Sequence, residues 1–240
     1  MTKTWFSRII LRRDAHVRAI AELLLPEADR HPTRQNGDTL NARHRLLWSL
    51  FPDAPDAKRD FLWREEKDGG FLVLSARQPR PGEYFHVESK EWAPALSPGD
   101  HLLFALRANP VISRKQPGSR RGQRHDFVMD ALKQHPEYFS GRLEQQERRN
   151  IRNDIIARAG GEWLSRHGAK HGFEVIAARS DGYRQHVIPR KKGTTPMRFS
   201  SLDIEGRLKV TEPEKFLTRL ASGFGAARAF GCGLMLIRRT

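Results

Sequence analysis

Two glycine–apolar–glycine triplets stand near the carboxyl end of the chain, Gly223-Phe224-Gly225 and Gly231-Cys232-Gly233, with Arg228 between them. Glycine adopts positive φ without steric cost and lets the backbone come close to a ligand. Amides arranged in this way can donate hydrogen bonds to phosphate oxygens, and an arginine adds a positive charge beside them. The segment follows a predicted helix and precedes an apolar strand. We therefore expect a phosphate-contacting loop at a helix-to-strand corner, with Gly223, Gly225, Arg228, Gly231 and Gly233 as its contact residues.

The charge balance also points to a polyanionic partner. The chain of 240 residues carries 43 lysines and arginines against 28 aspartates and glutamates, a net charge of +15, which favours nucleic acid or an acidic membrane surface. Two turn-rich segments, 114–124 and 190–192, hold basic clusters without any acid. Either cluster alone could be a solvated loop, but the two together favour nucleic acid. The candidate contact residues are Arg114, Lys115, Arg120, Arg121, Arg124, Arg190, Lys191 and Lys192.

Other classes of protein and site are disfavoured by composition. The sequence has no apolar run of about 18 residues and no amino-terminal apolar stretch of a signal peptide, so we expect a cytoplasmic protein without a membrane span. The single cysteine, Cys232, excludes an internal disulfide and fits a reducing compartment; between two glycines it is interpreted as a small buried residue. His167 and His171 could share a helix face, but no second ligand pair accompanies them, so we expect no metal site and no cofactor.

The first hundred residues alternate strands with one helix. Residues 5–11 predict a strand, and the apolar spacing from Leu40 to Phe51 predicts a helix that Pro52 ends. Residues 60–65 and 70–77 predict two strands joined by the turn Lys67-Asp68-Gly69-Gly70. A short strand is expected at 84–88.

The second half repeats this theme. Strands are expected at 101–108, 173–178, 185–189 and 198–210, and helical material between 126 and 167. Thr211-Glu212-Pro213-Glu214 predicts a capping box at the start of another helix. The order β-α-β-β-α-β is ferredoxin-like. We therefore predict an α+β fold of two tandem ferredoxin-like (RRM-like) βαββαβ domains, 1–97 and 98–240; topology alone does not give function.

Short segments spread along the whole chain match one known family in their order. They are Ile9-Ile10-Leu11, His44-Arg45-Leu46-Leu47-Trp48-Ser49-Leu50-Phe51-Pro52, Arg59-Asp60-Phe61-Leu62-Trp63-Arg64, Leu96-Ser97-Pro98-Gly99-Asp100, Phe104-Ala105-Leu106-Arg107-Ala108-Asn109-Pro110, Ile204-Glu205-Gly206-Arg207-Leu208 and the terminal glycine loop. With these segments the chain resembles the CRISPR RNA-processing endoribonucleases of the type I-E system, the CasE family. The resemblance implies two ferredoxin-like domains, recognition and cleavage of a CRISPR repeat RNA hairpin, and partners within a type I-E Cascade-like surveillance complex.

The resemblance also implies a catalytic histidine on the first helix, and the matching residue is His44. Taken without the family, His44 lies near the edge of the apolar stripe of its helix, which is typical of a half-buried structural histidine. Family members often carry a tyrosine three residues before the histidine, where this chain has Asn41, and an amide cannot exchange a proton. Arg45 matches a basic position of the family and is the candidate cation for the developing charge.

These residues predict a metal-independent cleavage. The 2′-hydroxyl beside the scissile phosphate is the nucleophile, and a histidine can remove its proton or protonate the leaving 5′-oxygen. The expected products carry a 2′,3′-cyclic phosphate and a 5′-hydroxyl. With Asn41 in place of tyrosine, the alternative is a slow or inactive member that only holds guide RNA. A general basic RNA-binding protein of ribosomal type is a third hypothesis, but it gives His44 no role.

Overall fold

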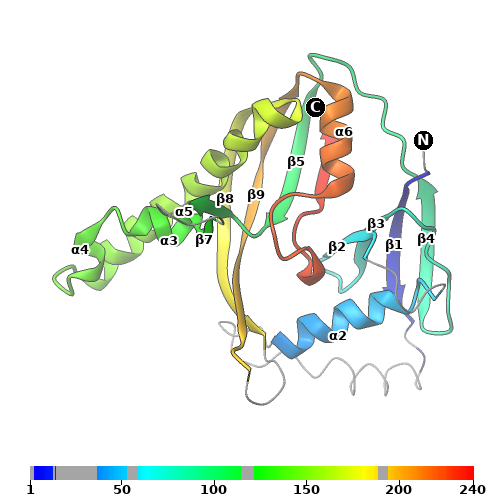
Figure 1. Cartoon of the computed structure of the whole chain (residues 1–240), viewed down its shortest axis with the longest axis horizontal. Helices are drawn as coiled ribbons and strands as arrows, with labels where there is room; N and C mark the ends of the chain where they lie inside the picture. The colour runs from blue at the N-terminus through cyan, green and yellow to red at the C-terminus, as the bar shows by residue number, and fades with distance from the viewer. Residues whose placement is uncertain (1–2, 13, 15–36, 53–58, 115–121, 189–193) are drawn as a thin grey trace.

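The chain forms two antiparallel four-stranded sheets that lie side by side (Figure 1). This computed structural model describes residues 3–12, 14, 37–52, 59–114, 122–188 and 194–240. The first sheet is built from strands between residues 5 and 91, and the second from strands between 101 and 239. The expected domain boundary at 97/98 falls in the connection between the sheets and stays a prediction. In the described part of the chain, no helix is long and apolar enough to cross a membrane.

The first sheet has the strand order β2-β3-β1-β4 of a ferredoxin-like unit. Its elements are β1 (Trp5–Leu11), α2 (Gly37–Trp48), β2 (Phe61–Glu65), β3 (Phe71–Ser75) and β4 (Phe85–Glu91). The predicted turn between β2 and β3 is confirmed: Gly69 has φ 83°, and the Gly70 amide donates to Asp68 Oδ1 at 3.0 Å. Residues 76–84 form turns and extended chain in place of the second helix, so this unit lacks one element of the predicted βαββαβ pattern.

The second sheet has the complete ferredoxin-like topology, with the order β10-β5-β9-β8. Its elements are β5 (His101–Ala108), β6 (Val111–Arg114), β7 (Gln123–Asp126), α3 (Phe127–Leu132), α4 (Pro136–Phe139), α5 (Gln145–Gly168), η1 (Ala169–His171), β8 (Phe173–Ile188), β9 (Met197–Val210), α6 (Pro213–Ser222), η2 (Arg228–Phe230) and β10 (Met235–Arg239). The β6–β7 hairpin and the short helices α3 and α4 are inserted between β5 and α5. The predicted class, α+β with two tandem ferredoxin-like units, is therefore confirmed.

Two local predictions in this half were wrong. The strands expected at 173–178 and 185–189 are parts of one long strand, β8, because two register shifts against β9 interrupt the alternation that marks a strand in sequence. The capping box expected from Thr211 does not form. The helix α6 begins instead at Pro213, after Glu212, whose side chain makes no capping hydrogen bond.

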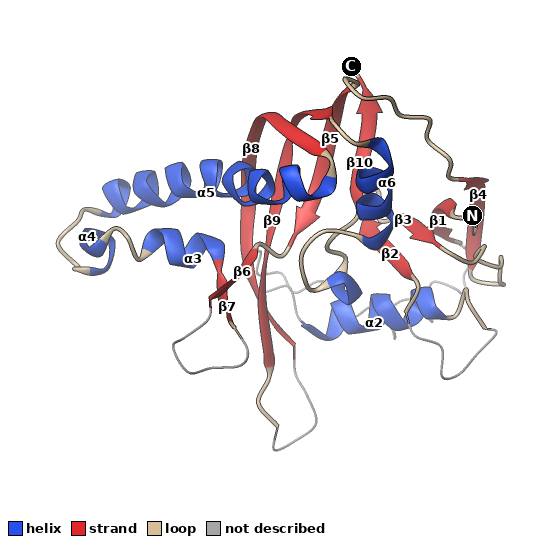
Figure 2. Cartoon of the chain, turned by 45° about the horizontal axis from the view of Figure 1, so that its top comes forward, coloured by secondary structure: helices blue, strands red, loops and turns tan. Residues whose placement is uncertain are grey.

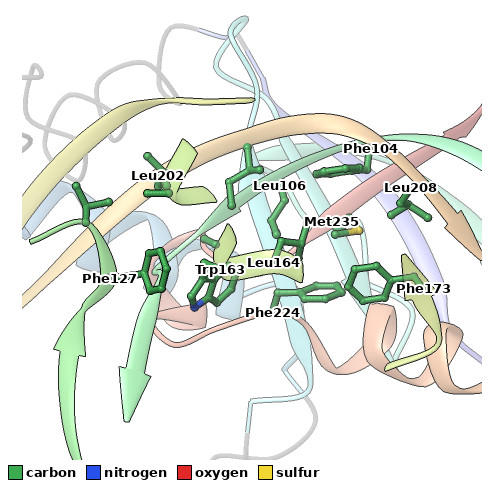
Figure 3. Close-up of a cluster of buried hydrophobic side chains, with 14 of the residues drawn as sticks. Phe104, Leu106, Phe127, Trp163, Leu164, Phe173, Leu202, Leu208, Phe224 and Met235 are labelled. Atoms are coloured by element: carbon green, nitrogen blue, oxygen red, sulfur yellow. The ribbon is translucent and has the colours of Figure 1, made fainter. Parts of the chain in front are cut away.

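The core of the second unit lies between its sheet and the helix α5, which crosses the sheet in Figure 2. Alternate residues of β5 are buried, as expected for a strand with one covered face. Gly160 of α5 allows close contact with the sheet, since a Cβ there would lie 2.7 Å from Ser180. The large side chains that fill this core, shown in Figure 3, are Phe104, Leu106, Phe127, Trp163, Leu164, Phe173, Leu202, Leu208, Phe224 and Met235.

A smaller apolar cluster joins the two units. Leu62 and Leu74 of the first sheet are buried against Leu234, which precedes β10 of the second unit. The glycine loop, residues 223–233, is held in the same region. Its glycines have φ between 70° and 97° at 223, 225, 231 and 233, so the predicted need for positive φ is confirmed. In Figure 1 the red loop that carries η2 accordingly lies beside β2 and α2.

Close packing explains why the loop needs glycine at 225. A Cβ on Gly225 would lie 2.7 Å from the Asn109 carbonyl oxygen and 3.3 Å from the Trp163 ring. Gly141 has a similar φ, 72°, but nothing lies within 4 Å of its would-be Cβ. Alanine at 141 would therefore meet only the unfavourable φ, whereas alanine at 225 would meet the unfavourable φ and steric overlap as well.

We expect Gly225→Ala to lower the free energy of unfolding more than Gly141→Ala does. The unfavourable φ costs an alanine about 1 kcal/mol at either position, and overpacking against a backbone oxygen adds about 1–3 kcal/mol at 225 alone. Urea unfolding of both variants measures the difference. Equal losses would contradict the close packing of the glycine loop.

Candidate active site

The imidazole of His44 lies where the two units meet. The apolar face of α2 packs on the first sheet, with Leu40 and Leu47 buried, and this orientation leaves His44 half-buried at the edge of that face. The ring centroid lies 5.9 Å from that of Phe61 in the first unit and 6.5 Å from that of Phe230 in η2. The edge position expected from the sequence is confirmed, and the second unit completes the surroundings of the ring.

The surroundings of His44 keep its imidazole neutral. Burial, and to a lesser degree the positive charge of Arg59, lower the pKa of His44 from 6.5 to about 4. Its Nε2 is buried and has no hydrogen-bond partner among the described residues. A neutral imidazole is the form that can accept a proton. The free protein thus holds a potential general base whose Nε2 is unpaired.

Three arginines line a hollow beside this histidine. The hollow measures about 410 Å³ and is lined by Arg59, Arg124, Arg228, Val111 and residues 225–227, with no carboxylate among them. Burial, followed by repulsion from Arg228, lowers the pKa of Arg59. Arg59 Nη1 is buried without a hydrogen-bond partner in the described structure. Like charges gathered without a counter-charge make this hollow a candidate site for an anion.

Arg59 was not singled out by the sequence, which favoured Arg45 as the cation next to His44. Arg45 is exposed, and the arginine whose charge acts on His44 is Arg59. Adjacent positions on a helix point about 100° apart, so neighbours in sequence need not face the same site. Arg59 stands just before β2 within a segment that carries the family resemblance, and that placement was the available clue. Asn41 is half-buried one helical turn before His44.

The basic loops are only partly described. Arg124, the second residue of β7, lines the arginine hollow. Arg114, on the paired strand, forms a 2.5 Å ion pair with Asp130, so its charge is already matched in the free protein. The remaining candidates lie outside the described residues; they are Lys115, Arg120, Arg121, Arg190, Lys191 and Lys192. Their contact with RNA stays a prediction.

The glycine loop supplies a charge and tight packing more than free amides. The Gly223 amide donates to Arg219 O and the Gly233 amide to Arg107 O, so these two are not available to a phosphate. Gly231 lies against the Trp63 ring, since a Cβ there would be 3.3 Å from it. The Arg228 side chain is held by a 3.1 Å hydrogen bond from its Nε to Gly225 O, which directs its charge to the hollow.

Cys232 and the pair His167 and His171 are the other reactive side chains that stand out in the sequence. Cys232 is fully buried, and burial raises the pKa of its thiol to about 12, which confirms the interpretation as a packing residue. The rings of His167 and His171 stack with centroids 5.9 Å apart. Within the described ranges, no three His, Cys, Asp or Glu side chains gather as a metal-binding group.

The fold and the site thus define a protein of two ferredoxin-like units with His44 and an arginine-lined hollow at their junction. The chain belongs to the family described as CRISPR associated protein, whose model matches residues 4–239.

Individual relatives agree with this family assignment. The CRISPR-associated endoribonuclease Cse3 of Thermus thermophilus is 29% identical over 199 residues, which cover 81% of this chain and 80% of the relative. The Cascade subunit CasE of Escherichia coli is 28% identical over 201 residues, covering 80% of this chain and 88% of the relative. The Thermus thermophilus Cse3 structure bound to an RNA representing a pre-cleavage complex has a TM-score of 0.65 at 22% identity, covering 98% of this chain and 99% of that one. At this identity the structural match supports the fold.

The electrostatic coupling between Arg59 and His44 gives a direct test. In the free protein we expect NMR titration to place the His44 midpoint near pH 4. Arg59→Gln should raise that midpoint, because the substitution removes a positive charge that disfavours the imidazolium. Arg45→Gln, the matched control, should leave it in place. Equal shifts in both variants would contradict the assignment of Arg59 to this site.

Lowering the pH should also reduce the free energy of unfolding through the protonation of His44. The unfolded chain binds the His44 proton near pH 6.5, and the folded chain binds it only near pH 4. Between these values the unfolded state therefore holds more protons, and the free energy of unfolding falls as the pH is lowered. Urea unfolding at pH 7 and pH 5, compared between the wild type and His44→Gln, measures this contribution as a smaller loss in the variant.

Proposed function

We propose that this protein is a metal-independent endoribonuclease that cleaves CRISPR precursor transcripts at repeat hairpins and acts within a type I-E surveillance complex. The single observation that carries the proposal is the neutral imidazole of His44 beside the arginines of the hollow, with its Nε2 unpaired among the described residues. Support also comes from the relatives, which are named an endoribonuclease and a Cascade subunit. The proposed catalytic unit comprises residues 1–97 and the proposed RNA-gripping unit residues 98–240.

The chemistry follows from the residue types at the junction. His44 accepts the proton of the 2′-hydroxyl, and the 2′-oxygen attacks the adjacent phosphorus while the bond from phosphorus to the 5′-oxygen breaks. The 5′-oxygen takes up a proton and leaves as a hydroxyl, and the other fragment ends in a 2′,3′-cyclic phosphate. General acid–base help of this kind contributes about 10²–10⁴-fold to the rate. Arg59 and Arg228 stabilise the negative charge that develops on the phosphate oxygens.

Binding of RNA also changes the charge around His44, the proposed general base. A phosphate in the hollow offsets the charge of Arg59, which is the smaller of the two causes that lower the pKa of His44; burial, the larger cause, remains. Asn41 has no titratable proton and is proposed to orient the RNA or His44. Arg45, being exposed, is proposed to contact the RNA backbone outside the reacting centre.

Two observations favour the alternative of a guide-RNA-binding subunit that cleaves slowly or not at all. The Nε2 atom of His44 is covered in the free protein, and its pKa near 4 makes it a weak base. Asn41 offers no proton exchange to compensate. A denaturing gel of labelled repeat RNA incubated with the protein distinguishes the two functions, because the alternative leaves the RNA intact.

His44→Ala is expected to abolish cleavage of repeat RNA while hairpin affinity stays within a few-fold of wild type, since the imidazole acts on the reacting atoms. Single-turnover cleavage and filter binding on the same RNA measure the two effects. His101→Ala, at an exposed position of β5, serves as the matched control. Loss of binding in His44→Ala would make this residue structural.

A second test uses the nucleophile. One 2′-deoxy nucleotide before the cut should block cleavage, because the attacking oxygen is missing. Addition of EDTA should leave cleavage of the all-ribose RNA unchanged. A reaction that stops with EDTA would rule out the metal-independent mechanism.

The arginines should make binding depend steeply on salt. Each neutralised phosphate releases counterions, so the logarithm of the binding constant falls linearly with the logarithm of salt concentration. Arg228→Gln should reduce that slope by about one contact's share, roughly 0.7–0.9, and slow cleavage as well. The same slope in variant and wild type would remove Arg228 from the RNA interface.

A further inference from the structure

A second hollow adjoins the arginine hollow on the second unit. It measures about 470 Å³ and shares Val111, Arg124 and residues 226–227 with its neighbour. The end of β5 and the paired parts of β8 and β9 form its remaining walls. Phe230, whose ring approaches His44, lines it as well. A group bound in this hollow would therefore lie next to the proposed cleavage site.

One buried acceptor in the hollow has no partner. Asn109 follows β5 directly, its backbone pairs with Ala226 of the glycine loop, and the residue is among those that line the hollow. Only 3% of the residue is exposed, and its Oδ1 accepts no hydrogen bond within the described structure. An unpaired buried acceptor destabilises a fold. The folded protein therefore carries the free-energy cost of an unpaired oxygen at Asn109. A ligand that donates a hydrogen bond to Oδ1 would remove this cost.

A second residue of the hollow, His186, also has a buried polar atom without a hydrogen-bond partner within the described ranges. His186 of β8 is 4% exposed, and its Nε2 lies 2.8 Å from Ser201 Oγ. Its Nδ1 is buried without a partner among the described residues. The Asp126 carboxylate, which also lines the hollow, is already satisfied: it accepts from Tyr183 Oη at 2.9 Å and from the Ser200 hydroxyl. Two residues that line this hollow, Asn109 and His186, thus each keep one buried polar atom without a partner in the described part of the chain.

Aromatic rings connect this hollow to the catalytic histidine. The His186 ring stacks on Phe199 at 4.7 Å between centroids, and Phe199 stacks on Phe230 at 5.3 Å. Phe230 then meets His44. Aromatic and apolar walls with a few polar groups are typical of pockets for flat, partly polar ligands, and an unstacked nucleobase is such a ligand.

The chemistry of Asn109 excludes one part of a nucleotide. A phosphate carries only acceptors under neutral conditions and cannot satisfy Oδ1. A nucleobase edge carries N–H donors and a ribose carries the 2′-hydroxyl donor, so either can. The aromatic walls of the hollow favour the flat base over the ribose. Arg124 at one edge of the hollow and the exposed Arg198 at another supply charge for the flanking phosphates.

We propose that this hollow binds one unpaired nucleobase next to the scissile phosphate, with an N–H of the base donating to Asn109 Oδ1 and its flat body against the Phe199–Phe230 wall. The proposal rests on the proposed RNA substrate but not on cleavage itself. Asn109 is thereby a specificity residue, because it reads the edge of the base. His186 is a second polar contact on the same side.

Asn109→Ala tests the proposal with a readout that a structural role would not give. The repeat RNA carries a 2′-deoxy nucleotide at the cut, so that binding is measured without cleavage. We expect about tenfold weaker binding, together with a Tm equal to or above that of wild type, because the substitution removes an unpaired buried acceptor. Asn153→Ala, at an exposed position of α5, should leave the binding of RNA unchanged.

A second experiment identifies which nucleotide of the RNA supplies the bound base. Abasic nucleotides are placed one at a time on either side of the cut, and each RNA is measured with wild type and Asn109→Ala. At one position the effect of Asn109→Ala should vanish, because the base that it contacts is gone. The proposal is overturned by wild-type affinity of Asn109→Ala, by a lowered Tm, or by an equal loss on every abasic RNA. Tight binding without cleavage of all-ribose RNA would instead contradict the proposed activity and leave the base pocket in place.

Discussion

The contact between Trp63 and the glycine loop holds the candidate site together. The Trp63 indole, 1% exposed in β2 of the first unit, donates from Nε1 to Ala229 O of the second unit at 3.1 Å. Its ring also lies where a side chain at 231 would have to be. This contact fixes η2 against the first sheet, and η2 carries both Phe230, which meets His44, and Arg228, which charges the hollow. A partly buried hydrogen bond across the two units therefore sets the distance between His44, the proposed general base, and the arginine hollow, the proposed phosphate site.

Unmatched charge and unpaired polar atoms mark the same region. Arginines 59 and 228 repel each other and His44 is held neutral. One buried atom each of Asn109 and His186 has no partner in the part of the chain that the structure describes. Each feature is unfavourable in the free protein, and a folded chain tolerates only a few of them because its net stability is small. Buried charge outside this region is matched only in part. Arg107 pairs with Asp203 through two 2.8 Å hydrogen bonds, whereas Arg12, Arg64 and Arg219 each have one buried nitrogen without a partner among the described residues. What sets the junction apart is that the unmatched groups line adjoining hollows, which supports a binding surface for RNA.

Much of the fold was predictable because it depends on local patterns. The alternation from His101 to Ala108, the turn at Asp68-Gly69 and the helix that ends before Gly223 each reflect neighbours within a few residues. Predictions failed where distant contacts override the local pattern. The register shifts of β8 are set by β9, and the first unit covers its sheet without the second helix that its topology would allow.

The sequence by itself determined the two ferredoxin-like units, the positive charge, the tight glycine loop and, through the family resemblance, the choice of His44. These follow from residue type, spacing and order along the chain. Only the tertiary structure decided that Arg59 and not Arg45 acts on His44. It also decided that the amides of Gly223 and Gly233 donate to backbone carbonyls, and that Asn109 Oδ1 is unpaired among the described residues. The reason is that each depends on which side chains from separate segments share a space, and on how much water that packing removes from them.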